Sequence, residues 1–359
     1  MRQLPLPRFV LAVYALLVVY ASLYPLAGWR DPGGSALAFL AAPWPRYVTA
    51  FDLGANFLGY LPYGLLCVLA AHPRLRGASA LLAAVLSGAA LSLVLEAAQS
   101  FLPARVPSNL DVLANAGGAA AGALLGWCLA PAFRDGGTFE RLRAEIFAQG
   151  TAADLGLTLL GLWLFAQLNP ATLLFGAGDL RDLFAGSEGP AYAAELFVSV
   201  EAGIASANLM AVVLLASALA RPGVPLVRRL ALLAALVAAA LLVKTLAFAI
   251  VMQAEHVLAW LTPGALLGLA AGSALALAAL ALPQAARLAL AAVLLMAATV
   301  LVNLAPPNPY LVAILKVWTQ GHFLNFNGLT HLVAAAWPFA ALAYLVFLAA
   351  RRGRESSLG

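Results

Sequence analysis

The chain has 359 residues, of which 64% are hydrophobic and only 10% are charged, with a formal net charge of +5. Soluble domains average about 25% charged residues, so this chain has too few charges to cover a water-soluble fold of its length. The composition excludes a soluble enzyme, a nucleic-acid-binding protein and a disordered chain, and it predicts an integral membrane protein.

Ten apolar stretches along the chain are long enough to cross a bilayer, whose core of about 30 Å requires about 20 residues of helix. They are rich in Ala and Leu and lack an alternation of apolar and polar residues, which favours helices over the strands of a β-barrel. The predicted fold is therefore an all-α polytopic membrane protein with about ten transmembrane helices. The stretches are 9–27, 54–71, 79–99, 111–130, 155–175, 192–219, 229–252, 257–281, 286–304 and 331–350.

The basic residues predict the orientation of these helices, because loops rich in Lys and Arg stay on the cytoplasmic side. One alternating set of connections and both termini hold most of them, and the opposite set holds few. We therefore expect both termini to be cytoplasmic. The basic-rich set has Arg2, Arg8, Arg74, Arg76, Arg134, Arg141, Arg143, Arg221, Arg228, Arg229, Arg287, Arg351, Arg352 and Arg354, and the opposite set has Arg30, Arg46, Arg105, Arg181 and Lys316.

The widest cytoplasmic connection divides the chain into two membrane domains. Residues 1–130 form a predicted four-helix domain, residues 131–153 an amphipathic cytoplasmic linker, residues 154–350 a second domain of about six helices, and residues 351–359 a cytoplasmic tail. The predicted outer segment 305–330, with Tyr310 and Trp318, is typical of an interfacial anchor.

The second half also repeats some spacings of the first. Asp52 lies 21 residues before Pro73, and Glu201 lies 21 residues before Pro222. A degenerate tandem four-helix repeat would explain this, since duplicated membrane domains are a known architecture. Chance similarity between Ala- and Leu-rich helices is the alternative.

Polar side chains gather where three helices of the first half reach the predicted outer face. Because charged and amide groups in a bilayer are costly and usually face a protein interior or a water-filled cavity, the pattern predicts a polar binding site. Capping for the two aspartates and interhelical hydrogen bonding for the two asparagines are the alternatives. The residues are Asp52 with Asn56, Glu96 with Gln99, Arg105 in the following loop, and Asp111 with Asn115.

These residues, in this order, resemble the signature of the VanZ-like family of bacterial membrane proteins. The pattern also includes Gly59, Pro62, Gly64, Gly118 and Gly122 at matching spacings, and the resemblance covers about residues 9–130. The family is named for a member linked to low-level teicoplanin resistance. The resemblance implies a role in the bacterial cell envelope, in the inner membrane, but it supplies no reaction.

Three hypotheses for function remain open. An outward-facing polar pocket in apolar walls suits a translocator or binder of an amphipathic molecule, such as a lipid-linked saccharide or its polyprenyl phosphate carrier, with Arg105 at the phosphate. An intramembrane enzyme could use Asp52, Glu96 or Asp111 as acid–base groups. A non-catalytic scaffold in envelope or exopolysaccharide assembly is the third. The expected partners are membrane lipids and a lipid-linked envelope intermediate, without nucleic acid.

The second half carries two further charges within its apolar stretches. The predicted orientation places both Glu201 and Lys244 in the outer half of the membrane, so a structural ion pair between them is predicted. Glu255 and His256 are too isolated for a metal site. The chain has no zinc-protease, phosphate-loop, serine-hydrolase or dinucleotide motif, so neither a metal nor a cofactor is expected.

Overall fold

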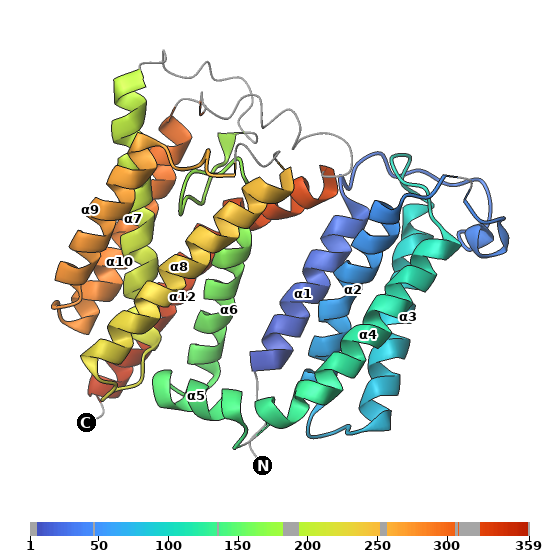
Figure 1. Ribbon diagram of the computed structural model, residues 1–359, viewed down its shortest axis with the longest axis horizontal. Coiled ribbons are helices and arrows are strands. Elements are labelled where there is room, and N and C mark those ends of the chain that lie inside the picture. Colours follow the sequence, from blue (N-terminus) through green and yellow to red (C-terminus); the bar gives the residue numbers. More distant parts are fainter. Residues whose placement is uncertain are drawn as a thin grey trace. The chain divides into compact units, whose positions relative to one another are not determined.

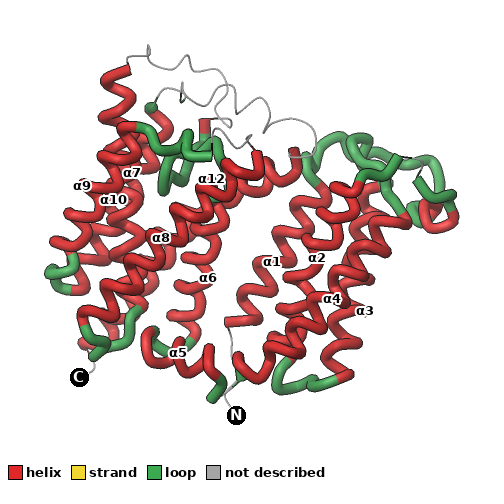
Figure 2. Tube along the Cα trace, in the orientation of Figure 1, coloured by secondary structure: helices red, strands yellow, loops and turns green. Residues whose placement is uncertain are grey.

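The computed structural model describes residues 6–45, 47–134, 136–181, 194–251, 257–305, 308 and 324–357. These residues form eleven α-helices and one short 3-10 helix, and no β-strand occurs among them (Figure 2). The chain divides into two compact units, Met1–Glu145 and Ile146–Gly359. The predicted anchors Tyr310 and Trp318, and the pair Glu255–His256, lie outside the described residues.

The prediction of an all-α polytopic membrane protein is confirmed. Over the part of the chain that the structure describes, eight helices are long and apolar enough to span a membrane, and two further apolar helices are shorter. Each of the ten predicted stretches overlaps one of these ten helices. The long helices are α1 (Leu6–Leu23), α2 (Ala50–Ala71), α3 (Ala78–Gln99), α4 (Asn109–Phe133), α7 (Ala194–Leu219), α8 (Leu226–Val251), α10 (Gln284–Leu304) and α12 (Leu324–Ser357), and the shorter ones are α6 (Thr151–Ala166) and α9 (Pro263–Ala279).

Helix α6 ends well before the end of its predicted stretch, which was expected to continue to residue 175. Pro170 has no backbone N–H and disfavours a helical conformation at Asn169, so the helix cannot continue through this dipeptide. The one described α-helix outside the ten stretches is α5 (Thr138–Ile146), a short amphipathic helix within the predicted linker.

The first unit is organised around a close crossing of α2 and α4, which lie side by side in Figure 1. Three glycines of α4, spaced four residues apart, face the backbone of α2. A Cβ at Gly118, Gly122 or Gly126 would overlap the carbonyl oxygen of Phe57, Leu61 or Leu65, respectively. Small residues permit this approach and the van der Waals contact that holds membrane helices together.

Helix α1 completes the first unit through polar contacts with α2. The Tyr14 hydroxyl donates a hydrogen bond to the Gly59 carbonyl oxygen at 2.7 Å. The Arg8 Nε donates to the carbonyl oxygen of Ala70 at 3.1 Å, near the other end of α2. These two bonds fix α1 along the length of α2.

The second unit contains a similar helix crossing, between α7 and α9. Gly264, Gly268 and Gly272 of α9 face α7 at Val198, Ala202 and Ser206, again at intervals of four residues. This parallel supports the predicted repeat, which stays a prediction.

The contacts also change how the two halves correspond. In the register of the glycine contacts, Val198 of α7 takes the place of Phe57 of α2. Glu201, three residues further along, then corresponds to Tyr60. The equal separations from Asp52 to Pro73 and from Glu201 to Pro222 had instead predicted that Glu201 corresponds to Asp52.

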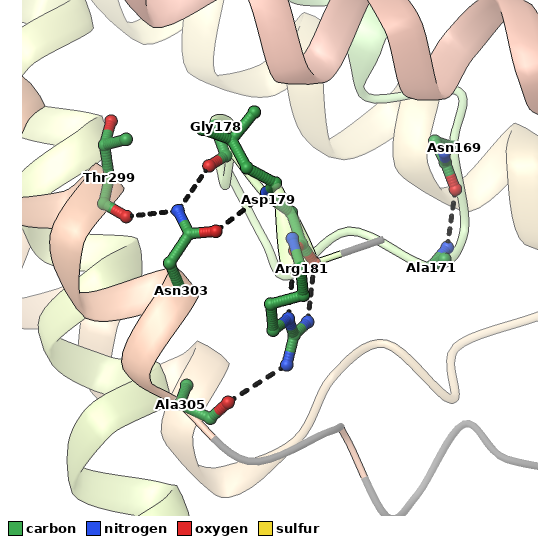
Figure 3. Close-up of polar contacts among 9 residues, drawn as sticks. Asn169, Ala171, Gly178, Asp179, Arg181, Thr299, Asn303 and Ala305 are labelled. Atoms are coloured by element: carbon green, nitrogen blue, oxygen red, sulfur yellow. Dashed lines mark hydrogen bonds and ion pairs between the residues drawn. The ribbon is translucent and has the colours of Figure 1, made fainter. Parts of the chain in front are cut away.

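An irregular segment, residues 167–181, follows α6 in the chain and is largely buried. Asn303 of α10 holds its end, as Figure 3 shows: the side-chain Nδ2 donates to the Gly178 carbonyl oxygen at 2.7 Å, and Oδ1 accepts from the Leu180 N–H at 2.8 Å. Arg181 donates to the Ala305 carbonyl oxygen at 3.0 Å and forms an ion pair with Asp179. Buried non-helical backbone must find such partners, because an unpaired N–H or C=O costs free energy.

The ion pair between Asp179 and Arg181 predicts an acid-sensitive contribution to stability. Burial acts to raise the pKa of Asp179, but the hydrogen bonds and positive charge of Arg181 outweigh it, so the pKa is lowered from 3.8. A lowered pKa in the folded state stabilises the fold above the unfolded value, and this stabilisation is lost as the pH falls through the folded value. Asp179→Asn should therefore flatten the decline of melting temperature below about pH 4. Asp31→Asn, in an exposed loop of the first unit, should leave that decline unchanged, and identical curves for the two variants would contradict the assignment.

Candidate polar binding site

Asp52 helps to cap the start of α2, where Thr49 is the N-cap residue and Asp52 lies in the first helical turn. The Thr49 side chain accepts a hydrogen bond from the Asp52 N–H at 3.1 Å, and the Asp52 carboxylate accepts from the Thr49 hydroxyl at 2.6 Å and from the Thr49 N–H at 3.3 Å. This reciprocal capping box satisfies backbone donors that have no partner within the helix. Asp52 therefore has the capping role predicted from the sequence as the alternative to ligand binding.

Glu96 connects the end of α3 to the start of α4. Its side chain is only 4% exposed, and Oε2 accepts a hydrogen bond from the Ser108 N–H at 2.8 Å. Ser108 in turn caps α4, since its hydroxyl oxygen accepts from the N–H groups of Leu110 and Asp111. A buried carboxylate from one helix thus fixes the residue that caps the next helix.

Gln99 and Arg105 both reach the end of α1. The Gln99 Nε2 donates to the Ser22 carbonyl oxygen at 3.0 Å, and the Arg105 Nη2 donates to the Ala21 carbonyl oxygen at 2.7 Å. The Arg105 Nε is buried and has no hydrogen-bond partner among the described residues. Burial lowers the pKa of the Arg105 guanidinium, and the nearby charge of Glu96 acts in the opposite direction. The Arg105 guanidinium therefore has an N–H left to donate, within electrostatic range of the Glu96 carboxyl group.

Asn115 lies deeper in the first unit and bonds to a residue that the sequence reading did not include. Its Nδ2 donates to the Ser92 hydroxyl oxygen at 2.9 Å, while its Oδ1 is buried without a partner among the described residues. The Tyr60 hydroxyl is also buried and unpartnered within hydrogen-bonding limits, near Ser92. Helical spacing could have identified both, since Ser92 lies four residues before Glu96 and Tyr60 four residues after Asn56.

Most of the predicted residues do come together at one end of the first unit. Asp111 lies close enough to Asp52 and Glu96 for electrostatic interaction, and its carboxylate is near the Asn56 side chain. Gln99 instead faces α1. The described residues include no group of three or more His, Cys, Asp or Glu side chains placed to hold a metal ion. The cluster can offer acceptors to hydroxyl groups and, through Arg105, donors to an anion.

The loop between α1 and α2 lies against this end of the unit. The Asn109 side chain donates to the Ala42 carbonyl oxygen at 2.8 Å, and the Ser100 hydroxyl donates to the Ala36 carbonyl oxygen at 3.0 Å. The loop exposes large apolar side chains, including Trp29 and Trp44, which are 50% and 64% exposed. Apolar surface therefore adjoins the polar cluster.

Glu201 and Lys244 do not form the predicted direct ion pair among the described residues. The Lys244 Nζ donates instead to the Asn169 carbonyl oxygen at 2.8 Å and to both oxygens of Thr172. The irregular segment after α6 supplies these oxygens, and they satisfy the ammonium without a carboxylate. Both side chains nevertheless line one small cavity.

Comparison with known proteins agrees with the resemblance seen in the sequence. Residues 10–130 match the model of the VanZ/LLP1 family. No curated protein and no solved structure matches the chain. The matched residues include α1 to α4 almost entirely and every member of the polar cluster. The chain is therefore a multi-pass membrane protein whose residues 10–130 form a VanZ-like segment.

Proposed function

We propose that the first unit binds the polar head group of an amphipathic cell-envelope intermediate, such as a lipid-linked saccharide or a polyprenyl phosphate, in the bacterial inner membrane. The observation that carries this proposal is Arg105, whose buried Nε has no hydrogen-bond partner among the described residues and whose charge interacts with that of Glu96. A guanidinium with a free donor suits a phosphate oxygen. The carboxylates and amides around it suit sugar hydroxyls.

The neighbouring loop supports an amphipathic ligand over a free sugar phosphate. Exposed apolar side chains such as Trp44 lie on the segment that Asn109 ties to the polar cluster. A polar head could contact the cluster while its apolar chain stays among these side chains and lipid. Binding of this kind would serve translocation of the intermediate or modulate sensitivity to glycopeptides of the teicoplanin type.

Lipid mass spectrometry of the purified full-length protein tests the proposal. We expect the wild-type protein to retain a phosphate- or sugar-bearing lipid from its host, and Arg105→Ala to retain at least about tenfold less, as expected for loss of a charge-assisted bond. Arg30→Ala is the matched control, because it removes the same charge from an exposed position in the loop after α1. It should retain the lipid at the wild-type level.

The same variants distinguish the other functions. Equal lipid retention by wild type and Arg105→Ala, at equal membrane levels, would overturn the binding proposal. Recovery of a processed lipid, lost in Glu96→Gln or Asp111→Asn, would favour an intramembrane enzyme instead. Unchanged sensitivity to envelope-targeting antibiotics in all three site variants would favour a scaffold.

A further inference from the structure

A second polar site lies inside the second unit, between α7, α8 and the segment before α9. Its cavity is lined by Glu201 of α7, Lys244 and Phe248 of α8, and Trp260 and Thr262 just before α9. The cavity volume of about 10 Å³ has room for about one water molecule. The site shares no residue with the polar cluster of the first unit, and the inference drawn from it does not rest on the proposed function.

Two buried polar atoms on the side chains around this cavity have no hydrogen-bond partner among the described residues. They are the carboxylate Oε2 of Glu201, a residue that is 2% exposed, and the indole Nε1 of Trp260, which is 7% exposed. One is an acceptor and the other is a donor. A single water molecule can satisfy both, because it accepts one hydrogen bond from the indole N–H while it donates another to the carboxylate.

Lys244 supplies a charge to the cavity but no free donor. Its ammonium has three N–H groups, and the structure gives it three acceptors, the carbonyl oxygens of Asn169 and Thr172 and the hydroxyl oxygen of Thr172. Lys244 and Glu201 are the two titratable side chains that line the cavity among the described residues. The Lys244 amine is therefore held by its three acceptors at the cavity that Glu201 also lines.

The start of α9 also favours a negative charge on Glu201. The Glu201 Oε2 lies against Gly264, where a Cβ would overlap it, and the Thr262 hydroxyl lies near the carboxylate. A helix N-terminus carries partial positive charge and stabilises anions. The apolar walls of the cavity, including Phe248 and Leu173, favour the neutral acid instead. Each protonation state of Glu201 thus has structural support.

We propose that Glu201 is a proton-binding site of the second unit, and that a water molecule held by the Trp260 N–H delivers the proton. A protonated water gives a proton to Oε2 of the carboxylate: the new O–H bond forms at Glu201, one O–H bond of the hydronium breaks, and neutral water stays on Trp260. Lys244 takes no part in this step. No electron is transferred in this step.

Labelling with dicyclohexylcarbodiimide tests the assignment, because the reagent reacts with protonated carboxyl groups in apolar surroundings. The full-length protein in detergent is labelled at intervals from about pH 5 to about pH 9, and the modified peptides are quantified by mass spectrometry. We expect labelling of Glu201 to rise as the pH falls and to be absent in Glu201→Gln. Trp260→Phe keeps an aromatic ring but removes the donor that holds the water, so its labelling curve should move up by about one pH unit.

The control is Trp337→Phe, which removes an indole N–H that already donates to the Leu159 carbonyl oxygen at 2.7 Å. It should label like the wild type. Labelling of Glu201 that does not change with pH, or identical curves for Trp260→Phe and wild type, would overturn the proposal. If Trp260→Phe gives no monodisperse protein, infrared spectroscopy of the wild type tests the proposal instead. A protonated-carboxyl band that grows with falling pH and is missing in Glu201→Gln would support proton binding by Glu201. Absence of that band from the wild type would overturn the proposal.

Discussion

Gly118→Ala should destabilise the protein by about 3 kcal/mol, the cost expected when an extra carbon is forced into a closely packed helix crossing. The added Cβ would overlap the Phe57 carbonyl oxygen. That oxygen belongs to the rigid backbone of α2, so it cannot rotate away as a side chain could. Relief of the overlap would require α2 and α4 to separate and to lose contact along their crossing.

The neighbouring glycine provides a matched control for this prediction. A Cβ at Gly117 would meet ring carbons of Phe57 at 3.6 Å, an ordinary contact distance. Since alanine is a better helix former than glycine by up to about 1 kcal/mol, Gly117→Ala should be neutral or slightly stabilising. In the same detergent, the melting temperature of Gly118→Ala should therefore fall, while that of Gly117→Ala should stay at or slightly above the wild-type value. Equal melting temperatures would show that the glycine contacts do not limit the crossing.

Lys244→Met should cost up to about 3 kcal/mol, because it leaves the buried Thr172 carbonyl oxygen without a hydrogen-bond donor among the described residues, at about 1–3 kcal/mol. Methionine has a similar length and fits an apolar site, so loss of the ammonium is the main change. The Thr172 carbonyl oxygen would lose its bond from Lys244, while the Asn169 carbonyl oxygen would keep the hydrogen bond from the Thr172 hydroxyl. Hydrogen exchange of the segment 167–175 should accelerate more than that of α7.

Thr245→Val is the control for this second variant. Its hydroxyl donates to the Leu241 carbonyl oxygen at 2.8 Å within α8 itself, so its removal leaves the irregular segment untouched. We expect its melting temperature and exchange pattern to stay near those of the wild type. The assigned role of Lys244 would be wrong if Lys244→Met proved as stable as Thr245→Val.

The positions of the membrane helices could be read from the sequence because the bilayer imposes both their length and their apolar character. All ten predicted stretches overlap a described apolar helix. The end of α6 was missed, although Asn169–Pro170 was visible, because hydrophobicity alone continues past that dipeptide. Its early end matters, since the released backbone provides the oxygens that Lys244 binds.

The polar cluster was only partly predictable. The predicted helix orientations placed Asp52, Glu96 and Asp111 at one depth. Helical spacing placed an amide on the same face as each acid, because residues three or four apart share a face. Sequence spacing could not identify the hydrogen-bond partner of each polar side chain. Glu96 bonds to the Ser108 N–H and Arg105 to the Ala21 carbonyl oxygen, and both partners are backbone atoms, which carry no sequence signal.

The sequence by itself therefore determined that the chain crosses the membrane and at which residues most of its helices lie. It also determined which few polar residues are candidates for a functional site. It could do so because hydrophobicity and helical period are local properties. Only the tertiary structure decided that Asp52 belongs to a capping box, that Arg105 has a buried donor without a partner in the described part of the chain, and that Lys244 binds backbone oxygens instead of Glu201. Those outcomes depend on which atoms come into contact when segments distant in the sequence pack together. The sequence separation of two residues does not determine whether they come into contact.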